Sequence, residues 1–503
     1  MNWETNPVAV FAGMKVTIMG LGVNGGGLES ARYLAQHGAE CTVTDMKDEK
    51  ALADSIEELE AIAAPHPPFR FVLGRHDMDD FSRADMVIKN PAVRPGSPYL
   101  AAARRIETDI SLFLAVSPAR LIAVTGSKGK SGTASALHWV LEKSRAAGLP
   151  GGTAFLGGNI TVSPLSFLDK LTEKDDAVLE LSSWQLGDLL VCGQKPGSGL
   201  INPRIAILTS IMPDHLDRYP GMEAYVNDKR IIYQGQNKEG ATIACSDDTW
   251  GKSFLAETPG RPLPYSERPI KTSPGAWLDT YSGAGMAFYN DEKVTVVPPR
   301  LLVPGRHNKK NFLAAALALL DIGIPASHIQ ENLGSFTGIE HRLEFFHETN
   351  GIRFYNDSTA TVPEAAAAAI EAFTYADDES EKSYTRLILV TGGTDKNLDF
   401  SPLAKKIKET TAAGTDLKII LLSGTGSEKL RPLLQGAGIS YYGPFDTIEK
   451  AAQTSLELGQ ETSPSAVQKP VIVTVLSPGC TSFGMFKNEF DRGRQWKEAV
   501  RRL

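Results

Sequence analysis

A glycine-rich segment directly after an apolar run carries the side chains best suited to binding phosphate. It reads Thr125-Gly-Ser-Lys-Gly-Lys-Ser-Gly-Thr133 and leads into residues with helical preference. Glycines let the backbone turn tightly, so its N–H groups converge on a phosphate, and the following helix N-terminus adds partial positive charge. Lys130 would supply a cation to the β- and γ-phosphates and Ser131 a hydroxyl to Mg²⁺. The segment predicts a nucleotide-phosphate site made of Gly126, Ser127, Lys128, Gly129, Lys130, Ser131 and Gly132.

The spacing of this loop differs from that of the common P-loop. Four residues separate the first glycine from Gly-Lys in the common motif, whereas only Ser127 and Lys128 separate Gly126 from Gly129. A glycine-rich turn that binds nothing is the alternative. The apolar run before, the helix after and the Gly-Lys-Ser order favour a phosphate site, but the loop alone does not identify a reaction.

A second glycine cluster lies near the N-terminus. Gly20, Gly22 and Gly25 have Gly-x-Gly-x-x-Gly spacing, and Asp45 follows about 20 residues later. This is the pattern of a dinucleotide-binding fingerprint, with the pyrophosphate at a helix N-terminus and the carboxylate on a ribose. The pattern supports the alternative hypothesis that the protein is an NAD-dependent oxidoreductase.

Two further candidate side chains follow apolar runs. Glu180 lies at the end of the run 177–181, a typical place for a site carboxylate in an open α/β sheet. His215 follows the next apolar run, 205–209, and a buried imidazole bonded only to backbone is the alternative for it. Both would reach a site at the carboxyl edge of one sheet.

Alternating strands and helices must position all of these residues. Three such stretches occur along the chain, so we predict an α/β fold with mostly parallel sheets. The predicted domains are 1–115 and 339–503, both Rossmann-like, and a central P-loop ATPase-like domain, 116–338. The predicted strands are 15–19, 41–44, 85–89, 121–125, 177–181, 205–209, 387–391, 417–422 and 471–476, and the predicted helices include 28–36, 131–146 and 312–320.

Composition excludes several classes of protein. The net charge of −7 gives no general attraction for nucleic acid. The four cysteines are far apart, as expected for reduced thiols. The most apolar helical segment, 312–324, is too short to span a bilayer, and residues 1–7 lack the features of a secretory signal. We therefore expect a cytoplasmic protein with neither a nucleic-acid nor a membrane partner.

Several blocks in fixed order resemble the Mur ligase family. The short loop is similar to the Gly-Thr-Asn-Gly-Lys-Ser/Thr loop that these ligases share with folylpolyglutamate synthetases, which lack a full α/β domain ahead of it. The end of the chain resembles that of the D-glutamate-adding members. The other matching blocks are Gly157–Ile160, Leu179–Leu186, Asp214–Pro220, Pro304–Asn308, His341–Glu344, Ser477–Asn488 and Arg492-Gly493.

The resemblance implies a reaction and a catalytic set. ATP would phosphorylate the carboxylate of UDP-N-acetylmuramoyl-L-alanine, the amine of D-glutamate would attack the acyl phosphate, and a tetrahedral intermediate would expel phosphate. The implied catalytic residues are Lys130, Glu180, His215 and Lys229. The implied Mg²⁺ ligands are Ser131, Glu180, His215 and Lys229, the last as a CO2-derived carbamate, which requires a lysine that is partly neutral near pH 7.

The remaining implied residues divide among three ligands. Asn308, Arg342 and Asp357 would hold the nucleotide of ATP together with the glycine loop, which implies closure of the third domain over the second. Val23, Asn24, Gly25, Asp45 and Asn159 would hold the UDP substrate, and Thr361, Lys396 and Ser482 the amino acid. A monomer is expected.

Three departures from the family pattern bear on specificity. Lys128 and Gly132 differ from the usual loop residues, and Gly484 replaces an aspartate. Thr359 stands where the family has a lysine close to the D-glutamate region. Each missing charged contact to a carboxylate is worth about 1–3 kcal/mol, so the same chemistry with another amino acid is an alternative. A nucleotide-binding protein without ligase activity is another.

Overall fold

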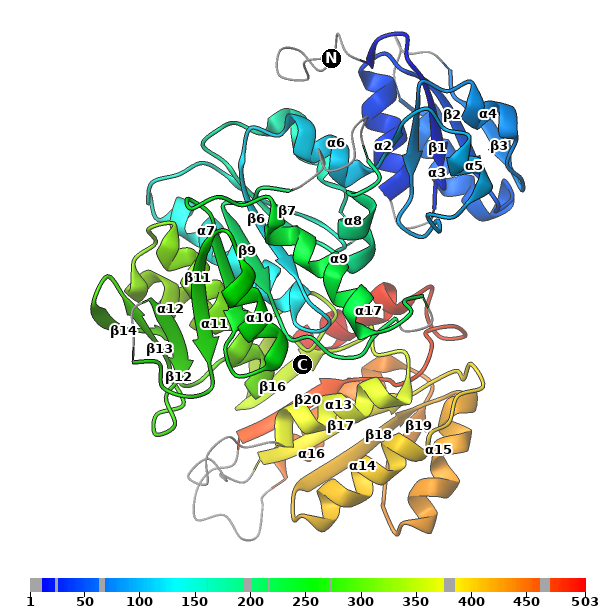
Figure 1. Ribbon diagram of the computed structural model, residues 1–503. Coiled ribbons are helices and arrows are strands. Elements are labelled where there is room, and N and C mark those ends of the chain that lie inside the picture. The colour runs from blue at the N-terminus through cyan, green and yellow to red at the C-terminus, as the bar shows by residue number, and fades with distance from the viewer. Residues whose placement is uncertain are drawn as a thin grey trace. The chain divides into compact units, whose positions relative to one another are not determined.

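Three sheets with mostly parallel strands make up the protein (Figure 1). The computed structural model describes residues 11–22, 26–62, 68–160, 162–192, 201–215, 218–271, 274–374, 385–461 and 471–503. The predicted α/β class is confirmed. The first two sheets belong to one compact unit and the third sheet to a second. Each sheet lies within one of the predicted ranges 1–115, 116–338 and 339–503, which stay a prediction as domain boundaries.

The first sheet has five parallel strands in the order β3-β2-β1-β4-β5. Ile18 and Ile88 pack in one apolar cluster, whereas Met19 and Val87 pack in another. The central strands are therefore covered on both faces, which explains their continuous apolar runs. The elements are β1 (Lys15–Met19), α2 (Gly26–Gln36), β2 (Glu40–Asp45), η1 (Lys50–Leu52), α3 (Ala53–Glu60), β3 (Arg70–Leu73), α4 (Met78–Ser82), β4 (Met86–Lys89), α5 (Pro98–Ala101), β5 (Ile106–Glu107) and α6 (Asp109–Val116).

The second sheet has nine strands in the order β14-β13-β12-β11-β10-β9-β6-β8-β7. Strands β12 and β13 pair antiparallel, while β6 lies between its parallel neighbours β8 and β9. The loop after β6 therefore emerges between the carboxyl ends of β8 and β9. The strands are β6 (Arg120–Thr125), β7 (Ala154–Gly158), β8 (Asp176–Glu180), β9 (Ile205–Leu208), β10 (Ala241–Cys245), β11 (Arg261–Ser266), β12 (Gly275–Leu278), β13 (Gly285–Tyr289) and β14 (Glu292–Val297). The helices are α7 (Lys130–Ala146), η2 (Pro164–Lys170), α8 (Ser183–Asp188), α9 (Met222–Gln234), α10 (Thr249–Glu257), α11 (Arg306–Asp321) and α12 (Ala326–Gly334).

The third sheet has six strands in the order β15-β16-β20-β17-β18-β19. All neighbours pair parallel except β15 with β16. The loops that follow β16, β20 and β17 therefore emerge next to one another. The elements are β15 (Glu344–Thr349), β16 (Ile352–Asn356), α13 (Pro363–Thr374), β17 (Thr385–Gly392), α14 (Ser401–Ala412), β18 (Asp416–Leu422), α15 (Thr425–Gly436), β19 (Tyr442–Phe445), α16 (Ile448–Gln460), β20 (Val471–Leu476) and α17 (Glu489–Arg501).

A buried ion pair links the first sheet to the second. Lys89, the last residue of β4, places its Nζ 2.6 Å from Oδ2 of Asp188, the last residue of α8, and both side chains are almost fully buried. Burial lowers the pKa of Lys89 and raises the pKa of Asp188 to about 6. Neither buried charge is solvated by water, so each depends on its partner for stabilisation. The pair therefore holds the end of β4 against α8.

We expect Lys89→Met to lower the thermal unfolding midpoint by more than about 5 °C, because a buried carboxylate without its partner costs about 3–5 kcal/mol. The double replacement with Asp188→Leu should recover most of this loss, since it removes both charges. Lys50→Met, at an exposed position, is the control. Calorimetry measures the midpoints, and a Lys89→Met protein that unfolds with the wild type would contradict a structural role for the pair.

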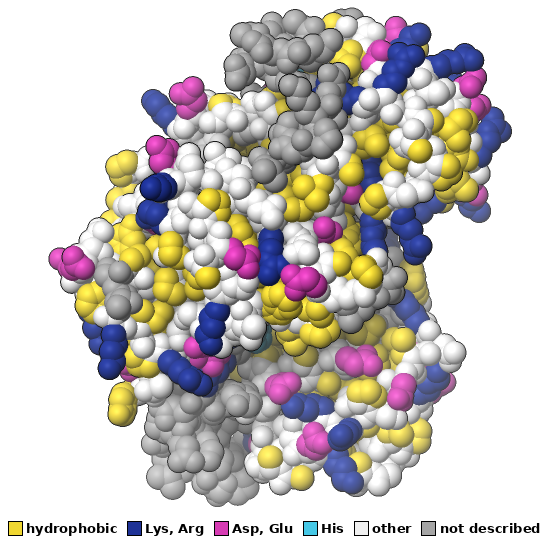
Figure 2. Space-filling view, in the orientation of Figure 1, with side chains coloured by type: hydrophobic (Ala, Val, Ile, Leu, Met, Phe, Trp, Pro, Cys, Tyr) yellow, Lys and Arg dark blue, Asp and Glu magenta, His cyan; other side chains and the backbone are white. Residues whose placement is uncertain are grey.

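Figure 2 shows Lys and Arg side chains scattered among Asp and Glu on the face in view, without a broad patch of one sign. In the part of the chain that the structure describes, no helix has both the length and the apolar character needed to cross a membrane.

Candidate active site

The loop between β6 and α7 has a backbone that only glycine adopts easily. Gly126 has φ of 144° and Gly129, the N-cap of α7, has φ of 91°. A Cβ on Gly126 would lie 1.9 Å from Oγ1 of Thr209, and one on Gly129 would lie 2.4 Å from Oδ1 of Asn311. Both glycines are therefore required by conformation and by close packing, as expected for a loop whose N–H groups converge on a ligand.

Hydrogen bonds hold the loop against the end of β9 and against α9. The N–H of Ser127 donates to the carbonyl of Ser210 at 2.8 Å. The Ser127 hydroxyl donates to the carbonyl of Met212 at 2.9 Å and lies 2.9 Å from the Tyr225 hydroxyl. Lys130 donates to the carbonyl oxygens of Gly126 and Ser127 at 3.0 and 3.1 Å. These bonds fix the conformation of the loop within the chain.

Glu180 lies beside the loop with one carboxylate oxygen unused. It ends β8, where its neighbour across the ladder is Val124 of β6. Its Oε1 accepts a bond from Nδ2 of Asn159 at 3.0 Å, whereas its Oε2 is buried without a hydrogen-bond partner. A buried, unpartnered carboxylate oxygen at a phosphate loop fits a hard cation such as Mg²⁺. Asn159 thereby lies at the same point of the sheet as Glu180.

Lys229 of α9 reaches the first glycine of the loop. Its side chain is almost fully buried, its Nζ donates to the carbonyl of Gly126 at 2.9 Å, and Nζ lies 4.4 Å from the ring centre of Tyr225. Burial, followed by the positive charge of Lys130, lowers the pKa of Lys229 to about 7. The amine is therefore substantially neutral near pH 7, which is the state that reacts with CO2.

His215 lies next to Tyr225. Its ring centre is 6.4 Å from that of Tyr225 and 5.0 Å from that of Trp184. The side chain is 46% exposed, so the buried imidazole considered as an alternative is not what the structure has. Among the described residues, no group of three or more His, Cys, Asp or Glu side chains has an arrangement that could hold a metal.

Tyr225 is a site residue that the sequence reading missed. It contacts Ser127 of the loop, the imidazole of His215 and the side-chain nitrogen of Lys229. Its position four residues before Lys229 could have indicated its role, because side chains at i and i+4 lie on one face of a helix. The loop, His215 and Lys229 are thus brought together around one buried aromatic ring.

A cavity of about 300 Å³ adjoins this group of residues. The Arg218 guanidinium lies 3.9 Å from the Trp184 ring centre, and the Tyr219 hydroxyl donates to Asp228 at 2.7 Å. Asp228 directly precedes Lys229 on α9, so this helix contributes to both the cavity and the loop site. Its lining residues are Arg94, Pro95, Trp184, Gly187, Asp188, Arg218, Tyr219 and Asp228.

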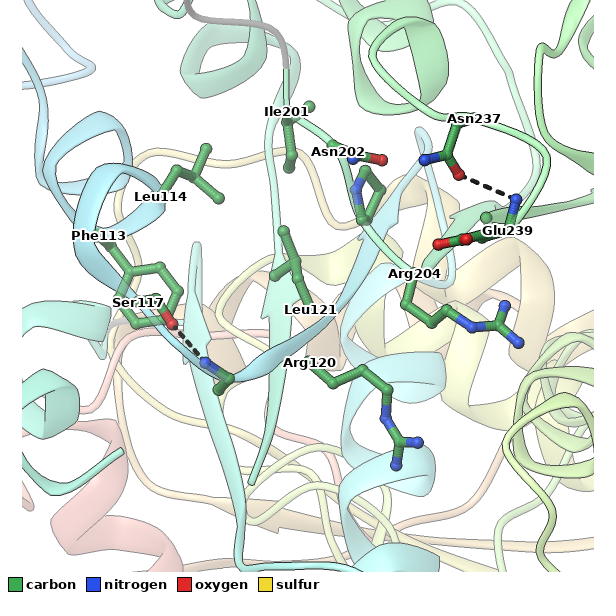
Figure 3. A pocket seen from close by; sticks show the side chains of 13 residues that line it. Phe113, Leu114, Ser117, Arg120, Leu121, Ile201, Asn202, Arg204, Asn237 and Glu239 are labelled. Carbon is green, nitrogen blue, oxygen red and sulfur yellow. Dashed lines mark hydrogen bonds between the residues drawn. The ribbon is translucent and has the colours of Figure 1, made fainter. Parts of the chain in front are cut away.

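A larger cavity, of about 410 Å³, lies at the opposite edge of the second sheet, where β6, β9 and β10 begin. Figure 3 shows Arg120 and Arg204 among its lining side chains. Arg120 donates to Asp176 at 2.6 Å, and Arg204 lies 2.7 Å from Asp321. Both guanidinium groups already have carboxylate partners, and the cavity is remote from the loop after β6.

The predicted UDP site is described only in part. Asp45 ends β2, and its carboxylate accepts bonds from the N–H groups of Gly22 at 3.1 Å and Lys47 at 2.9 Å. The carboxylate therefore adjoins the glycine cluster, as its spacing predicts. Val23, Asn24 and Gly25 lie outside the described residues.

The residues of the second unit that are predicted to bind the nucleotide differ in burial and in hydrogen-bond partners. Asp357 follows β16, and its carboxylate accepts bonds from the Ser477 hydroxyl at 2.6 Å and the Leu343 N–H at 3.2 Å. Burial raises the pKa of Asp357 to about 6. Arg342 is exposed, and the Asn308 side chain donates to the carbonyl of Pro304 at 2.6 Å.

The predicted amino-acid residues lie on three adjacent loops, those after β16, β17 and β20. The Thr481 N–H donates to the carbonyl of Thr394 at 3.0 Å, which joins the loop of Ser482 to that of Lys396. The Gly479 N–H donates to the carbonyl of Ala360 at 2.9 Å, which joins the loop of Ser482 to that of Thr361. The three loops form one local group within the second unit.

Thr359 does not replace the charge of the missing lysine. Its hydroxyl and its N–H both donate to the carbonyl of His341, at 2.8 and 3.2 Å. The side chain therefore serves to hold the loop and leaves no strong donor for a carboxylate.

Two family models match the chain. The model for the Mur ligase MurD-like N-terminal domain covers residues 14–111, and the model for the Mur ligase middle domain covers residues 124–319. The chain belongs to the Mur ligase family, so the resemblance predicted from its sequence is confirmed. It is therefore an ATP-dependent ligase that acts on small molecules.

Individual relatives match nearly the whole chain. The chain is 41% identical to the UDP-N-acetylmuramoylalanine--D-glutamate ligase of Treponema pallidum, with 98% of each chain covered. It is 36% identical to the enzyme of the same name from Borreliella afzelii, with 96% of each covered. The N-terminal model spans the motif from Gly20 to Asp45, and nothing in these matches supports the oxidoreductase alternative.

Solved structures share the fold at low identity. One is a UDP-N-acetylmuramoyl-L-alanyl-D-glutamate--2,6-diaminopimelate ligase, with a TM-score of 0.55, 15% identity, and 99% of this chain and 94% of that chain covered. Another is the UDP-N-acetylmuramate-alanine ligase of Thermotoga maritima, with a TM-score of 0.53, 18% identity, and 97% and 99% covered. Both support the three-sheet architecture.

Proposed function

We propose that this chain joins D-glutamate to UDP-N-acetylmuramoyl-L-alanine at the expense of ATP, in the synthesis of peptidoglycan precursors. The whole-length relatives carry that activity in their names. The structural observation that carries the proposal is the convergence of Lys130 and Lys229 on the carbonyl of Gly126, at 3.0 and 2.9 Å. A cation and a buried, partly neutral amine at one point of a glycine loop suit a site where the phosphate chain of ATP is held during transfer.

The chemistry begins with activation of a carboxylate. A carboxylate oxygen of the UDP substrate attacks the γ-phosphorus of ATP, and the bond to the β,γ-bridging oxygen breaks, so ADP leaves. The neutral amine of D-glutamate then attacks the acyl carbon of the acyl phosphate and loses a proton. The tetrahedral intermediate collapses by breaking the carbon–oxygen bond to phosphate, which leaves with one oxygen of the original carboxylate. Catalysis consists mainly of positioning and charge stabilisation.

The residues around the loop divide this work. The N–H groups from Gly126 to Gly132, with Lys130, bind the β- and γ-phosphates. Glu180, Ser131, His215 and a carbamate on Lys229 would hold Mg²⁺, which neutralises charge on the phosphates when bound. Carbamylation removes the ammonium charge at Lys229 and replaces it with an anion. The buried, partly neutral amine supports this modification.

The other ends of the site bind the remaining groups. Val23, Asn24, Gly25, Asp45 and Asn159 would take the UDP substrate. Asn308, Arg342 and Asp357 would take the nucleoside of ATP, and Thr361, Lys396 and Ser482 the amino acid. The domains 1–115, 116–338 and 339–503 would correspond to these three tasks, in a cytoplasmic monomer without a membrane or nucleic-acid partner.

The test is phosphate release across a panel of amino acids. With ATP, Mg²⁺ and UDP-N-acetylmuramoyl-L-alanine, we expect release with D-glutamate and little with L-glutamate, D-aspartate or L-lysine. Thr359 motivates the panel, since the family lysine is absent. A preference for another amino acid would transfer the proposal to that substrate, and no release with any of them would overturn the ligase assignment at this site.

A further inference from the structure

Arg492 is a buried arginine whose hydrogen bonds go to backbone carbonyls. It lies on α17, its side chain is almost fully buried, and α17 packs against β15 and β16. One terminal nitrogen donates to the carbonyls of Cys480 and Thr481 at 3.1 and 2.9 Å, and the other donates to the carbonyl of Ser358 at 2.7 Å. Within the described residues, Arg492 has no carboxylate at salt-bridge distance.

These three bonds fix the direction of three peptide groups. In a planar trans peptide the carbonyl and the next residue's N–H point to opposite sides, so the N–H groups of Thr359, Thr481 and Ser482 point away from Arg492. The N–H of Thr359 donates to His341, and that of Thr481 donates to Thr394. Among the described residues, neither the N–H nor the hydroxyl of Ser482 has a hydrogen-bond partner.

The guanidinium therefore ties together the loops on which Thr361, Lys396 and Ser482 lie. It bonds two loops directly and reaches the Lys396 loop through the Thr481–Thr394 bond. It leaves one N–H and one hydroxyl, both of Ser482, open for an anion. Two donors at one residue, backed by a buried positive charge, are a suitable setting for a carboxylate.

The charge of Arg492 remains in place at neutral pH. Burial lowers the pKa of Arg492 to about 10, which leaves the side chain cationic near pH 7. Its Nε is buried without a hydrogen-bond partner, so the carbonyl bonds do not use all of its donors. The carboxylates of Glu489 and Asp357 act on Arg492 electrostatically, without a salt bridge. The positive charge behind the three peptides favours an anion placed beyond them.

We propose that Arg492 is the positioning residue for a carboxylate of the incoming amino acid, which the Ser482 N–H and hydroxyl bind directly. Resting on the proposed function, this assigns to Arg492 part of the positive charge that Thr359 does not supply. Arg492 acts on Asp357 electrostatically, but the hydrogen bonds of Asp357 go to Ser477 and Leu343, so we expect a smaller effect on the nucleotide side of the loop.

The experiment compares Arg492→Lys and Arg492→Gln with the wild type in the full reaction. We expect the KM for the amino acid to rise about tenfold or more in Arg492→Gln, because bonds to a charged group are lost. The KM values for ATP and for the UDP substrate should change less than about threefold. Arg492→Lys keeps the charge but loses the planar fork, so its amino-acid KM should fall between the two.

Arg494→Gln is the matched control, since it removes an exposed arginine from the same helix. Parallel rises in all three KM values, or an unchanged amino-acid KM, would overturn the proposal. If Arg492→Gln does not fold, Arg492→Lys alone must show the selective rise. The wild-type protein is first tested with the panel of amino acids. The KM is then measured for the amino acid that the wild type uses. A failure of the D-glutamate assignment is thus detected separately from a failure of the proposal for Arg492.

Discussion

Lys130→Ala should reduce kcat by about 10³-fold, because it removes a preorganised cation from the phosphate on which charge develops. This side chain donates to the carbonyls of Gly126 and Ser127 of the loop. The replacement leaves the two loop glycines in place, so the backbone cradle should persist. Steady-state phosphate release with all three substrates measures the effect.

Lys143→Ala provides the control for this loss. Lys143 lies in the last turn of the same helix, α7, with its ammonium 4.4 Å from the ring centre of Trp139. Its removal should leave kcat within about twofold of the wild type, as expected for a surface change. A Lys130→Ala enzyme within tenfold of the wild type would mean that the loop is not where ATP is activated.

Lys229→Ala should also lose about 10²–10³-fold in kcat, since it removes a charged group from the centre of the site. The wild-type amine lies on the Gly126 carbonyl and beside Tyr225, so its removal opens a space in the shape of the lost side chain. Formate, acetate or propionate should then restore part of the activity by placing a carboxylate where the carbamate would be. Activity is measured against the concentration of each acid.

Two variants make this rescue specific. Lys130→Ala lacks a cation and should gain nothing from added carboxylates. Arg230→Ala changes the residue next to Lys229 but acts on the surface pairs with Glu223 and Glu257, so it should remain active without rescue. If no acid raises the activity of Lys229→Ala, the residue does not act as a carbamate.

The fold was predictable where strands are buried on both faces. All nine predicted strands occur in the structure. Continuous apolar runs between turn residues are a clear sequence pattern for strands buried on both faces. The Gly275–Leu278 and Gly285–Tyr289 hairpin was missed because its strands are short and rich in glycine and alanine. Strand β11 contains Pro262 and Pro264, which argue against a strand in sequence. The acidic segment 377–382, read as a loop, lies outside the described residues.

The site was predictable where its residues terminate strands or begin a helix. The loop, Glu180 and Asp45 follow that rule, and their neighbours in the structure are those that the sheet order requires. Tyr225 and Arg492 could not be read this way, since a buried aromatic or arginine on a helix looks like packing or surface until its partners are known. Tyr225 contacts Ser127, 98 residues away, and Arg492 bonds to Ser358, 134 residues away, as well as to Cys480 and Thr481.

The most direct test follows an oxygen atom through the reaction. UDP-N-acetylmuramoyl-L-alanine labelled with ¹⁸O in its terminal carboxylate is incubated with ATP, Mg²⁺, D-glutamate and the wild-type protein. The released phosphate is then analysed by mass spectrometry. Attack of that carboxylate on ATP predicts one ¹⁸O in each phosphate released from doubly labelled substrate, dependent on D-glutamate. Phosphate without label would mean that ATP is hydrolysed by water, and would contradict an acyl-phosphate ligase.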